Sequence, residues 1–255
     1  MIVIPMAGLS ARFARAGYQL PKFMLGAHGE TLFTFAMASF ARYFRNEPFL
    51  FIPRAGHSAR EFISQQCRHL GIVNFRIVEL SAETRGQADT VAHGLEASGV
   101  TGETPLTIFN IDTMRRAYRH PIEQQQYNAA GALEVFAAAG THWSFVRTVS
   151  PESPVAVEVA EKRRISDLCC TGNYTFASAG MYLELTERLR KRLAADPTIE
   201  MFVAPMYNDL ISAERTVVVS RVPSTDISVF GTPEEYLRFL ESPIRLQKVL
   251  DAACE

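Results

Sequence analysis

The sequence predicts an α/β fold built on a mainly parallel β-sheet. In the first half, apolar strands alternate with helices at the lengths typical of βαβ units, and 255 residues suffice to bury one large core. Strands are expected at residues 2–7, 48–53, 74–80 and 105–111, with helices between them at 31–45, 58–70 and 86–97. Right-handed crossovers would place the carboxyl ends of these strands at one edge of the sheet, where such folds bind ligands.

The pattern changes after residue 113. Three segments have the character of strands joined by turns, at residues 131–140, 142–150 and 155–166. We expect helices at 180–194 and 200–212, a late strand at 215–223 and a closing helix at 232–241. Thr232 is the expected N-cap of that last helix and Pro233 its first residue. Because no stretch is polar or proline-rich enough for a linker, a single domain spanning residues 1–255 is expected.

Composition narrows the class of protein. The 26 basic and 27 acidic residues leave a net charge of −1, so no basic excess indicates a nucleic acid or an anionic membrane as partner. The apolar start has no basic segment before it and is typical of a buried strand rather than a signal peptide, and no apolar run could span a bilayer. The four cysteines lack a CxxC pair, which predicts free thiols and a cytoplasmic location. The six histidines are scattered, so a bound metal would use carboxylates.

The first strand runs directly into the small-residue turn GLSAR (residues 8–12), and Pro21-Lys22 follows. Small residues let backbone N–H groups approach phosphate oxygens, and the Arg12 and Lys22 side chains add positive charge. The turn is neither a P-loop nor a GxGxxG fingerprint. An ordinary strand-to-helix turn with a solvated lysine is therefore the competing interpretation.

Two aspartates follow predicted strands. Asp112, in the segment NIDT (110–113), would sit at the binding edge of the sheet, although an aspartate there also commonly begins a turn. Asp226 lies far downstream, after the late strand. Brought together, the two could hold Mg²⁺, which takes one or two carboxylates and completes its shell with water and substrate phosphate.

In this order the motifs resemble the nucleotidylyltransferases that join a nucleoside triphosphate to a sugar 1-phosphate, especially the bacterial branch found with capsule and surface-polysaccharide biosynthesis. The family loop GxGxR followed by PK corresponds to residues 8–12 and 21–22. ETRGQADTV (83–91) resembles the helix start that touches the base, and VAEKRRISDLCCTGNYTF (159–176) resembles the segment lining the substrate pocket. DISVFGTPEEY (226–236) resembles the family's DxGTPEDY, with extra residues between the aspartate and the glycine.

The resemblance implies a Rossmann-like three-layer sandwich of the glycosyltransferase-A/nucleotidylyltransferase type, with a mixed, mainly parallel sheet. It implies an Mg²⁺-dependent transferase acting on a nucleoside triphosphate and a phosphorylated acceptor, with a nucleotide-binding half at about residues 1–113 and an acceptor-binding half at about 114–255. A homo-oligomer is compatible with the sequence.

The resemblance also assigns roles to residues. Arg12, Lys22 and Asp112 would be catalytic, and Asp112 and Asp226 would hold the metal. The expected nucleotide-binding residues are Ala7, Gly8, Leu9, Ser10, Gly86 and Gln87. The expected acceptor-binding residues are Glu161, Lys162, Gly172 and Asn173.

Three alternatives stay open at this point. The acceptor could be a phosphorylated amino acid or a choline-like compound, because the motifs do not separate acceptors. A glycosyltransferase that consumes a nucleotide sugar would need a DxD motif, where this chain has Asn110-Ile111-Asp112. A non-catalytic, nucleotide-sensing regulatory subunit would keep the fold without turnover.

Overall fold

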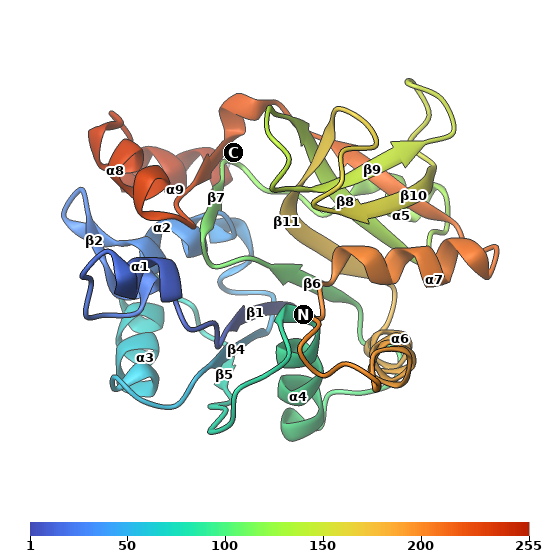
Figure 1. The fold of residues 1–255 in the computed structure, drawn as a ribbon. Helices are drawn as coiled ribbons and strands as arrows, with labels where there is room; N and C mark the ends of the chain where they lie inside the picture. The colour runs from blue at the N-terminus through green and yellow to red at the C-terminus, as the bar shows by residue number, and fades with distance from the viewer. Residues whose placement is uncertain (255) are drawn as a thin grey trace.

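The computed structural model describes residues 1–254; Glu255, the last residue of the expected domain, lies outside the described residues. Within them, a mixed nine-stranded sheet forms the centre of the molecule (Figure 1). Its first half is parallel and has the order β6-β1-β4-β5. These strands are β1 (Ile2–Met6), β4 (Phe49–Pro53), β5 (Phe75–Ile77) and β6 (Leu106–Phe109). The predicted α/β fold with a mainly parallel sheet is confirmed.

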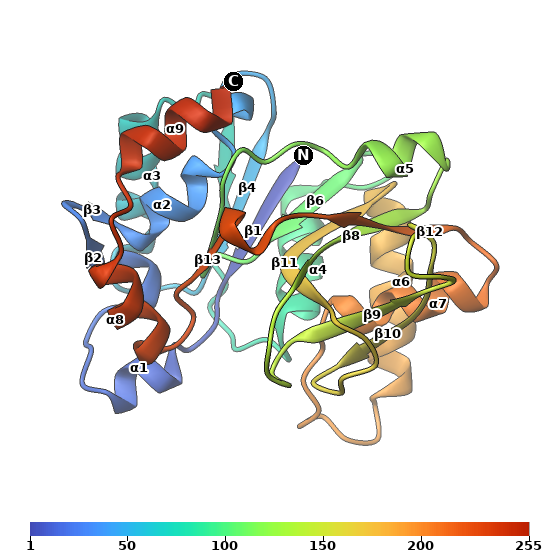
Figure 2. The ribbon, with the colours of Figure 1, turned by 90° about the horizontal axis from the view of Figure 1, so that it is seen from above.

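Successive side chains of the parallel strands enter two different cores, one on each face of the sheet. In β1, Ile2 and Ile4 lie in one core and Val3 in the other, because neighbouring residues of a strand point to opposite faces. The first face is covered by α2 (Leu32–Ala38), α3 (Ala59–Leu70), α8 (Pro233–Glu241) and α9 (Leu246–Cys254). The second is covered by α4 (Gln87–Ser98), α6 (Ala179–Arg192) and α7 (Tyr207–Ser212), as Figure 2 shows. Burial on both faces explains why the strands are apolar throughout.

β11 (Leu168–Phe176) joins the two halves of the sheet. It pairs antiparallel with β6 on one side, with Tyr174 opposite Ile108, and with β8 (Gly131–Ala137) and β9 (Ser144–Thr148) on the other. β10 (Ala156–Glu161) pairs with β9, and β12 (Val217–Arg221) runs parallel to β8. The nucleotide and acceptor halves expected from the sequence therefore share one continuous sheet.

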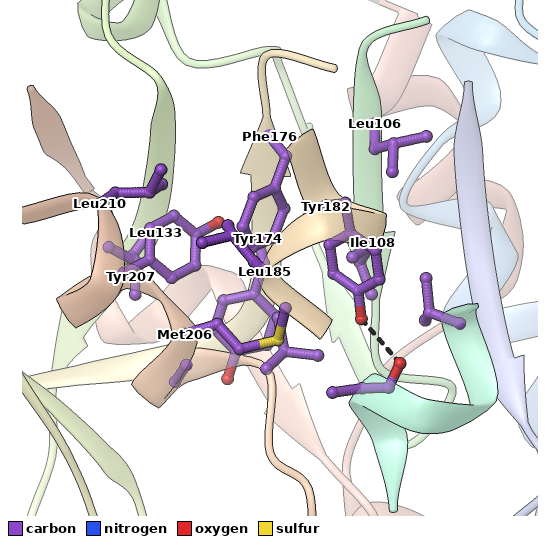
Figure 3. Packing of buried hydrophobic residues seen from close by; sticks show 14 of the residues in the cluster. Leu106, Ile108, Leu133, Tyr174, Phe176, Tyr182, Leu185, Met206, Tyr207 and Leu210 are labelled. Atoms are coloured by element: carbon purple, nitrogen blue, oxygen red, sulfur yellow. Dashed lines mark hydrogen bonds between the residues drawn. The ribbon is translucent and has the colours of Figure 1, made fainter. Parts of the chain in front are cut away.

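The core on the second face is aromatic around β11 (Figure 3). The Phe176 and Tyr207 rings stack with centroids 4.6 Å apart, and the Tyr182 ring meets Phe176 edge-on at 4.9 Å. The Tyr182 hydroxyl donates to the Ala88 carbonyl at 3.0 Å (dashed in Figure 3). This bond ties α6 to the start of α4, the helix whose amino end faces the site described below.

Short elements complete the chain. They comprise α1 (Ala11–Arg15), α5 (Ile122–Gln126), the paired strands β2 (Gly26–Ala27) and β3 (Glu30–Thr31), and the ladder of β7 (Thr113–Arg115) with β13 (Ile227–Val229). The 3-10 turns are η1 (Lys22–Met24), η2 (Ala41–Tyr43), η3 (Ala204–Met206) and η4 (Ser224–Asp226).

Some predicted boundaries differ from the structure. The helix expected over 31–45 ends at Ala38 and continues as η2, and the helix expected from residue 200 begins only with η3, where Pro205 occupies the first turn. The predicted cap of α8 is confirmed: the Thr232 hydroxyl accepts from Glu235 N at 3.2 Å, and the Glu235 carboxylate accepts from Thr232 N at 2.9 Å. All four cysteines are unpaired thiols, as expected, and no helix within residues 1–254 is long and apolar enough to cross a membrane.

Candidate active site

A cavity of about 1050 Å³ opens at the carboxyl ends of β1 and β6, the edge where the sequence places its motifs. Its lining comes from the loops after β1, β5, β6 and β13, and from β10, β11 and the segment before η3. The site residues expected from the sequence all line this cavity except Asn173 and Asp226. The fold therefore gathers segments that are far apart in the chain into one site.

The loop after β1 forms one wall. Ser10 adopts a left-handed conformation (φ 50°), and its hydroxyl accepts from Lys22 N at 3.3 Å. This bond holds the GLSAR turn against the Pro21-Lys22 segment. Among the described residues, the Arg12 guanidinium has no hydrogen-bond or ion-pair partner, and it lies close enough to Asp112 to lower the pKa of that carboxyl. The loop thus presents a positive charge that the protein itself leaves unpaired.

Lys22 and Asp112 form the charged centre of the cavity. The Lys22 ammonium donates to Asp112 Oδ2 at 2.6 Å, and both side chains are about four-fifths buried (21 % and 24 % exposed). Burial alone would raise the pKa of Asp112, but the charge of Lys22 and its hydrogen bond outweigh burial, so the net pKa lies below its ordinary value. The carboxylate is therefore ionised at neutral pH and available to a cation.

Gly231, in the GTP segment after β13, packs directly against this carboxylate. A Cβ built on Gly231 would lie 2.7 Å from Asp112 Oδ2. The main chain holds the two segments together, because Phe230 N donates to the Asp112 carbonyl at 2.9 Å. Only a residue without a side chain leaves room for the carboxylate in this position.

The loop before α4 forms the adjoining wall. Gly86 has φ +124°, a conformation that favours glycine, and the Gln87 side-chain amide donates to the Asn110 side-chain carbonyl. Asn110 N in turn donates to the Gly172 carbonyl at 3.0 Å, and a Cβ on Gly172 would collide with the Asn110 side chain at 2.6 Å. The glycine predicted from the TGxY motif is therefore required by packing at the cavity wall.

The far end of the cavity is lined by β10 and its neighbours. Glu161 accepts a hydrogen bond from the Ser144 hydroxyl. Burial raises the pKa of Glu161, and the nearby Glu200 carboxylate adds to the rise, against the lowering effects of Ser144 and Lys162. The Lys162 ammonium lies 4.4 Å from the centroid of the Phe202 ring and 4.0 Å from Glu161 Oε1. This end combines one cation, two carboxylates and an aromatic wall.

Asp226 is not part of this site, which corrects the predicted pair of metal ligands. In the β7–β13 ladder, Asp226 pairs with Arg116, whereas Asp112 pairs with Phe230. Four positions therefore separate the two aspartates, roughly 13 Å at about 3.3 Å per residue. The Asp226 carboxylate instead accepts from the Arg115 guanidinium at 3.3 Å. Within residues 1–254, no group of three or more His, Cys, Asp or Glu side chains is placed to hold a metal ion.

Asn173 is also misplaced by the sequence prediction. It is 1 % exposed and does not line the cavity. Its side chain lies near Tyr118 and Glu134, inside the protein, because adjacent residues of β11 alternate between faces and Gly172 takes the face toward the cavity. The prediction carried over one residue too many from the TGxY motif.

Several residues of the far end were not predicted from the sequence. His142, Trp143, Glu200 and Phe202 all line the cavity. Trp143 is the single tryptophan of the chain, and its position at the start of a predicted strand was the available signal. Glu200 and Phe202 lie in an irregular segment without a motif, so no sequence pattern marked them.

A solved structure of high similarity identifies the family. The nucleoside-diphosphate-sugar pyrophosphorylase from Vibrio cholerae RC9 is 41 % identical to this chain, covering 95 % of it and 100 % of that protein, with a TM-score of 0.89. The chain belongs to the nucleotidyltransferase family. It is accordingly a nucleotidylyltransferase of the sugar-nucleotide pyrophosphorylase type, which confirms the predicted enzyme class.

More distant structures show that the nucleotidyltransferase fold is shared. A UDP-glucose pyrophosphorylase complexed with UDP-glucose has a TM-score of 0.70 at 16 % identity, covering 94 % of this chain and 96 % of that one. An inositol-1-phosphate CTP transferase from T. maritima has a TM-score of 0.67 at 16 % identity, covering 97 % and 95 %. No protein-family model and no curated protein matches the chain.

Proposed function

We propose that this nucleotidylyltransferase joins a nucleoside triphosphate to a sugar 1-phosphate with the help of Mg²⁺, releasing pyrophosphate, in the cytoplasmic synthesis of a surface-polysaccharide precursor. One observation carries the proposal. A single cavity has positive charge at two places, Arg12 with Lys22 near the strand ends and Lys162 at the far end, and an ionised aspartate beside the first. Two phosphate-bearing substrates that react with one another need this arrangement.

In the proposed reaction an oxygen of the acceptor phosphate attacks the α-phosphorus of the triphosphate. The new P–O bond forms in line with the bond that breaks, and the electrons of that bond leave with pyrophosphate. The backbone of Ala7 and Gly8 holds the nucleotide, and Gly86 and Gln87 meet the base. Arg12 and Lys22 bind the triphosphate and stabilise the charge that develops on the leaving group. Lys162 orients the acceptor phosphate for attack.

The residues present fit a magnesium ion in a limited way. Asp112 is ionised, and its Oδ2 is already held by a cationic group, the Lys22 ammonium. One carboxylate, substrate phosphate oxygens and water suffice for Mg²⁺, so the loss of Asp226 from the site leaves the proposal intact. When bound there, the ion would offset negative charge on the phosphates. Before the nucleotide binds, the Lys22 ammonium would neutralise the charge of Asp112 in place of the ion.

A second acceptor class is favoured by the far end of the cavity. The carboxylates of Glu161 and Glu200 and the rings of Trp143 and Phe202 line it together. Aromatic faces and carboxylates bind ammonium groups as well as sugars. A phosphorylated amine, such as a choline-like compound, is therefore the alternative acceptor.

The test is a matrix of four nucleoside triphosphates against sugar 1-phosphates and phosphorylated amines, with pyrophosphate release as the readout. We expect turnover with one pair of substrates, abolished by excess EDTA and restored by Mg²⁺. Asp112→Asn should lose most turnover while remaining folded. Asp167→Asn is the matched control, because Asp167 also accepts from a cation, Arg164, at 2.7 Å but is 88 % exposed and outside the cavity.

Two results would contradict the proposal. No pyrophosphate from any combination would remove the transferase reaction, and an undiminished rate in EDTA would remove the metal. The polysaccharide role is tested separately: a deletion strain should lose the surface polymer and regain it with the wild-type gene, but not with Asp112→Asn.

A further inference from the structure

Two loops that both line the cavity are joined to one another. The nucleotide loop (residues 84–88) and the acceptor loop (residues 193–202) exchange backbone hydrogen bonds, Ala88 N to the Met201 carbonyl at 2.9 Å and Met201 N to the Arg85 carbonyl at 2.5 Å. Gly86 packs so closely here that a Cβ would lie 2.8 Å from Glu200 Cγ and from the Met201 backbone. The end of the acceptor loop is therefore fixed by main-chain contacts.

The beginning of the acceptor loop is fixed by one side chain. Arg85 Nη2 donates to the carbonyls of Leu193 and Asp196, both at 3.0 Å. Leu193 is the C-cap of α6, where carbonyl groups lack helical partners and attract positive charge. Arg85 thus spans the junction, with its backbone in the nucleotide loop and its guanidinium on the acceptor loop.

The nucleotide loop has supports of its own. Arg85 N donates to Asp89 Oδ2 at 3.0 Å, the Thr90 hydroxyl donates to the Gly86 carbonyl at 3.0 Å, and the Thr84 and Thr90 hydroxyls lie 2.6 Å apart. Asp89 is 7 % exposed at its side chain and is held in turn by Arg190. None of these contacts uses the Arg85 guanidinium. Removing that group should therefore loosen the acceptor loop and leave the nucleotide loop in place.

The acceptor loop lies next to Lys162. It leads into Phe202, whose ring lies 4.4 Å from the Lys162 ammonium, and it carries Glu200, whose charge acts on Glu161. The loop segment 196–200 is exposed throughout, and the side-chain hydrogen bonds that reach the start of the loop from outside it come from Arg85. The main-chain bonds of Met201 hold the loop beside Phe202, whereas the path of residues 193–200, which ends at Glu200, depends on Arg85.

We infer that Arg85 is a positioning residue for the acceptor: by holding the start of the acceptor loop, it sets the path of the loop up to Glu200 and so places Glu200 near Glu161, at the Lys162 end of the cavity. This inference rests on the proposed function, because it assigns the acceptor to that end of the cavity. Arg85 is among the residues that line the cavity, but its guanidinium donates to carbonyls of the acceptor loop, so its proposed action is through the loop.

The experiment compares Arg85→Ala with Arg221→Ala. Arg221 is a matched control, because its Nη2 also donates to two backbone carbonyls, Pro151 at 3.0 Å and Ser153 at 3.1 Å, but it does not line the cavity. Arg85→Ala should raise the acceptor KM on the order of tenfold, as expected for losing charge-assisted hydrogen bonds, and change the nucleotide KM by less than about twofold. Arg85→Lys, which keeps the charge and can reach a carbonyl, should recover part of the acceptor KM.

A second readout does not depend on turnover. In Arg85→Ala, hydrogen–deuterium exchange should rise in residues 193–202. In Arg221→Ala, exchange in these residues should match that of the wild type, and residues 84–90 should stay protected in both variants. Unchanged exchange in 193–202, or an equal rise in both KM values, would overturn the inference. If wild type turns over no substrate pair, the proposed function fails, and the exchange data still decide whether Arg85 holds the loop.

Discussion

Substituting Gly231 by alanine tests the role of Asp112 without changing any charge. The added methyl would lie 2.7 Å from Asp112 Oδ2 and 3.2 Å from Asp112 Cγ. The backbone of Gly231 is outside the left-handed region, so alanine is compatible with its conformation. The three atoms nearest to the added methyl group all belong to Asp112, so its closest contact is with the carboxylate.

The size of the effect follows from the contact. Carbon and oxygen atoms in close contact normally lie about 3.3 Å apart or more, so the carboxylate must shift by roughly 0.6 Å. That oxygen is the acceptor of the 2.6 Å bond from Lys22. A charge-assisted hydrogen bond contributes about 1.5–3 kcal/mol, so kcat/KM should fall on the order of tenfold to a hundredfold. Alanine also restricts the unfolded chain, which stabilises by about 0.4–1 kcal/mol and offsets part of the clash.

Pyrophosphate release measures the effect, and thermal unfolding checks the fold. Gly26→Ala is the matched control, because its Cβ would meet only the Glu30 carbonyl at 3.8 Å, an ordinary contact. We expect Gly26→Ala to retain wild-type kcat/KM. If Gly231→Ala retained it too, at an unchanged Tm, the position of the Asp112 oxygen would not matter for turnover and the central role of this carboxylate would be refuted.

Three further substitutions separate the roles of the charged residues. Lys162→Ala should raise the acceptor KM or lower turnover, so that kcat/KM falls about tenfold to a hundredfold, while the nucleotide affinity measured by calorimetry stays nearly unchanged. If the variant lost nucleotide affinity instead, the two phosphate sites would be reversed. Arg12→Ala should lower kcat more than it weakens nucleotide binding, because the charge of Arg12 matters most as pyrophosphate departs. If the variant kept wild-type kinetics, the loop would be an ordinary strand-to-helix turn. Asp226→Asn should leave the Mg²⁺ dependence of the rate unchanged. It should lower the free energy of unfolding by about 1 kcal/mol, or Tm by roughly 2–4 °C, because Arg115 loses one of its partners. An altered Mg²⁺ requirement would contradict the ladder geometry.

The parallel half of the fold was predictable because its strands carry their own signal. β1 and β4 are buried at every position, so they appear in the sequence as uninterrupted apolar runs. Because parallel strands end at one edge of the sheet, the glycine-containing and charged loops that come after them are expected at that edge. The same rule predicts that the loops carrying Arg12, Lys22 and Asp112 meet at that edge, and the three residues do line one cavity.

The second half was less predictable because its pairings are long-range. β11 pairs with β6, β8 and β9, and nothing in its own nine residues states which partners it takes. The face of each β11 side chain follows from that pairing, so a motif match could not tell that Gly172 faces the cavity and Asn173 the interior. α9 was not predicted, although Ser242-Pro243 ends the preceding helix and Leu246, Val249 and Leu250 recur at helical spacing after it.

The position of Asp226 has a physical cause that the motif could not reveal. The family motif matches Asp226 to a metal ligand by its place before Gly231 in the sequence. The position of its carboxylate in space is instead set by the register of β13 on β7. In that register Val229, two residues before Gly231, lines the cavity at the place where a DxG motif would have its aspartate. The extra residues therefore move the acidic side chain down the ladder to Arg115 and leave an apolar one at the cavity. Within residues 1–254 no group of three or more metal-binding side chains includes Asp112, so under the proposed function a metal ion held by Asp112 would need further oxygen ligands from substrate phosphates and water, and would bind together with the nucleotide rather than ahead of it.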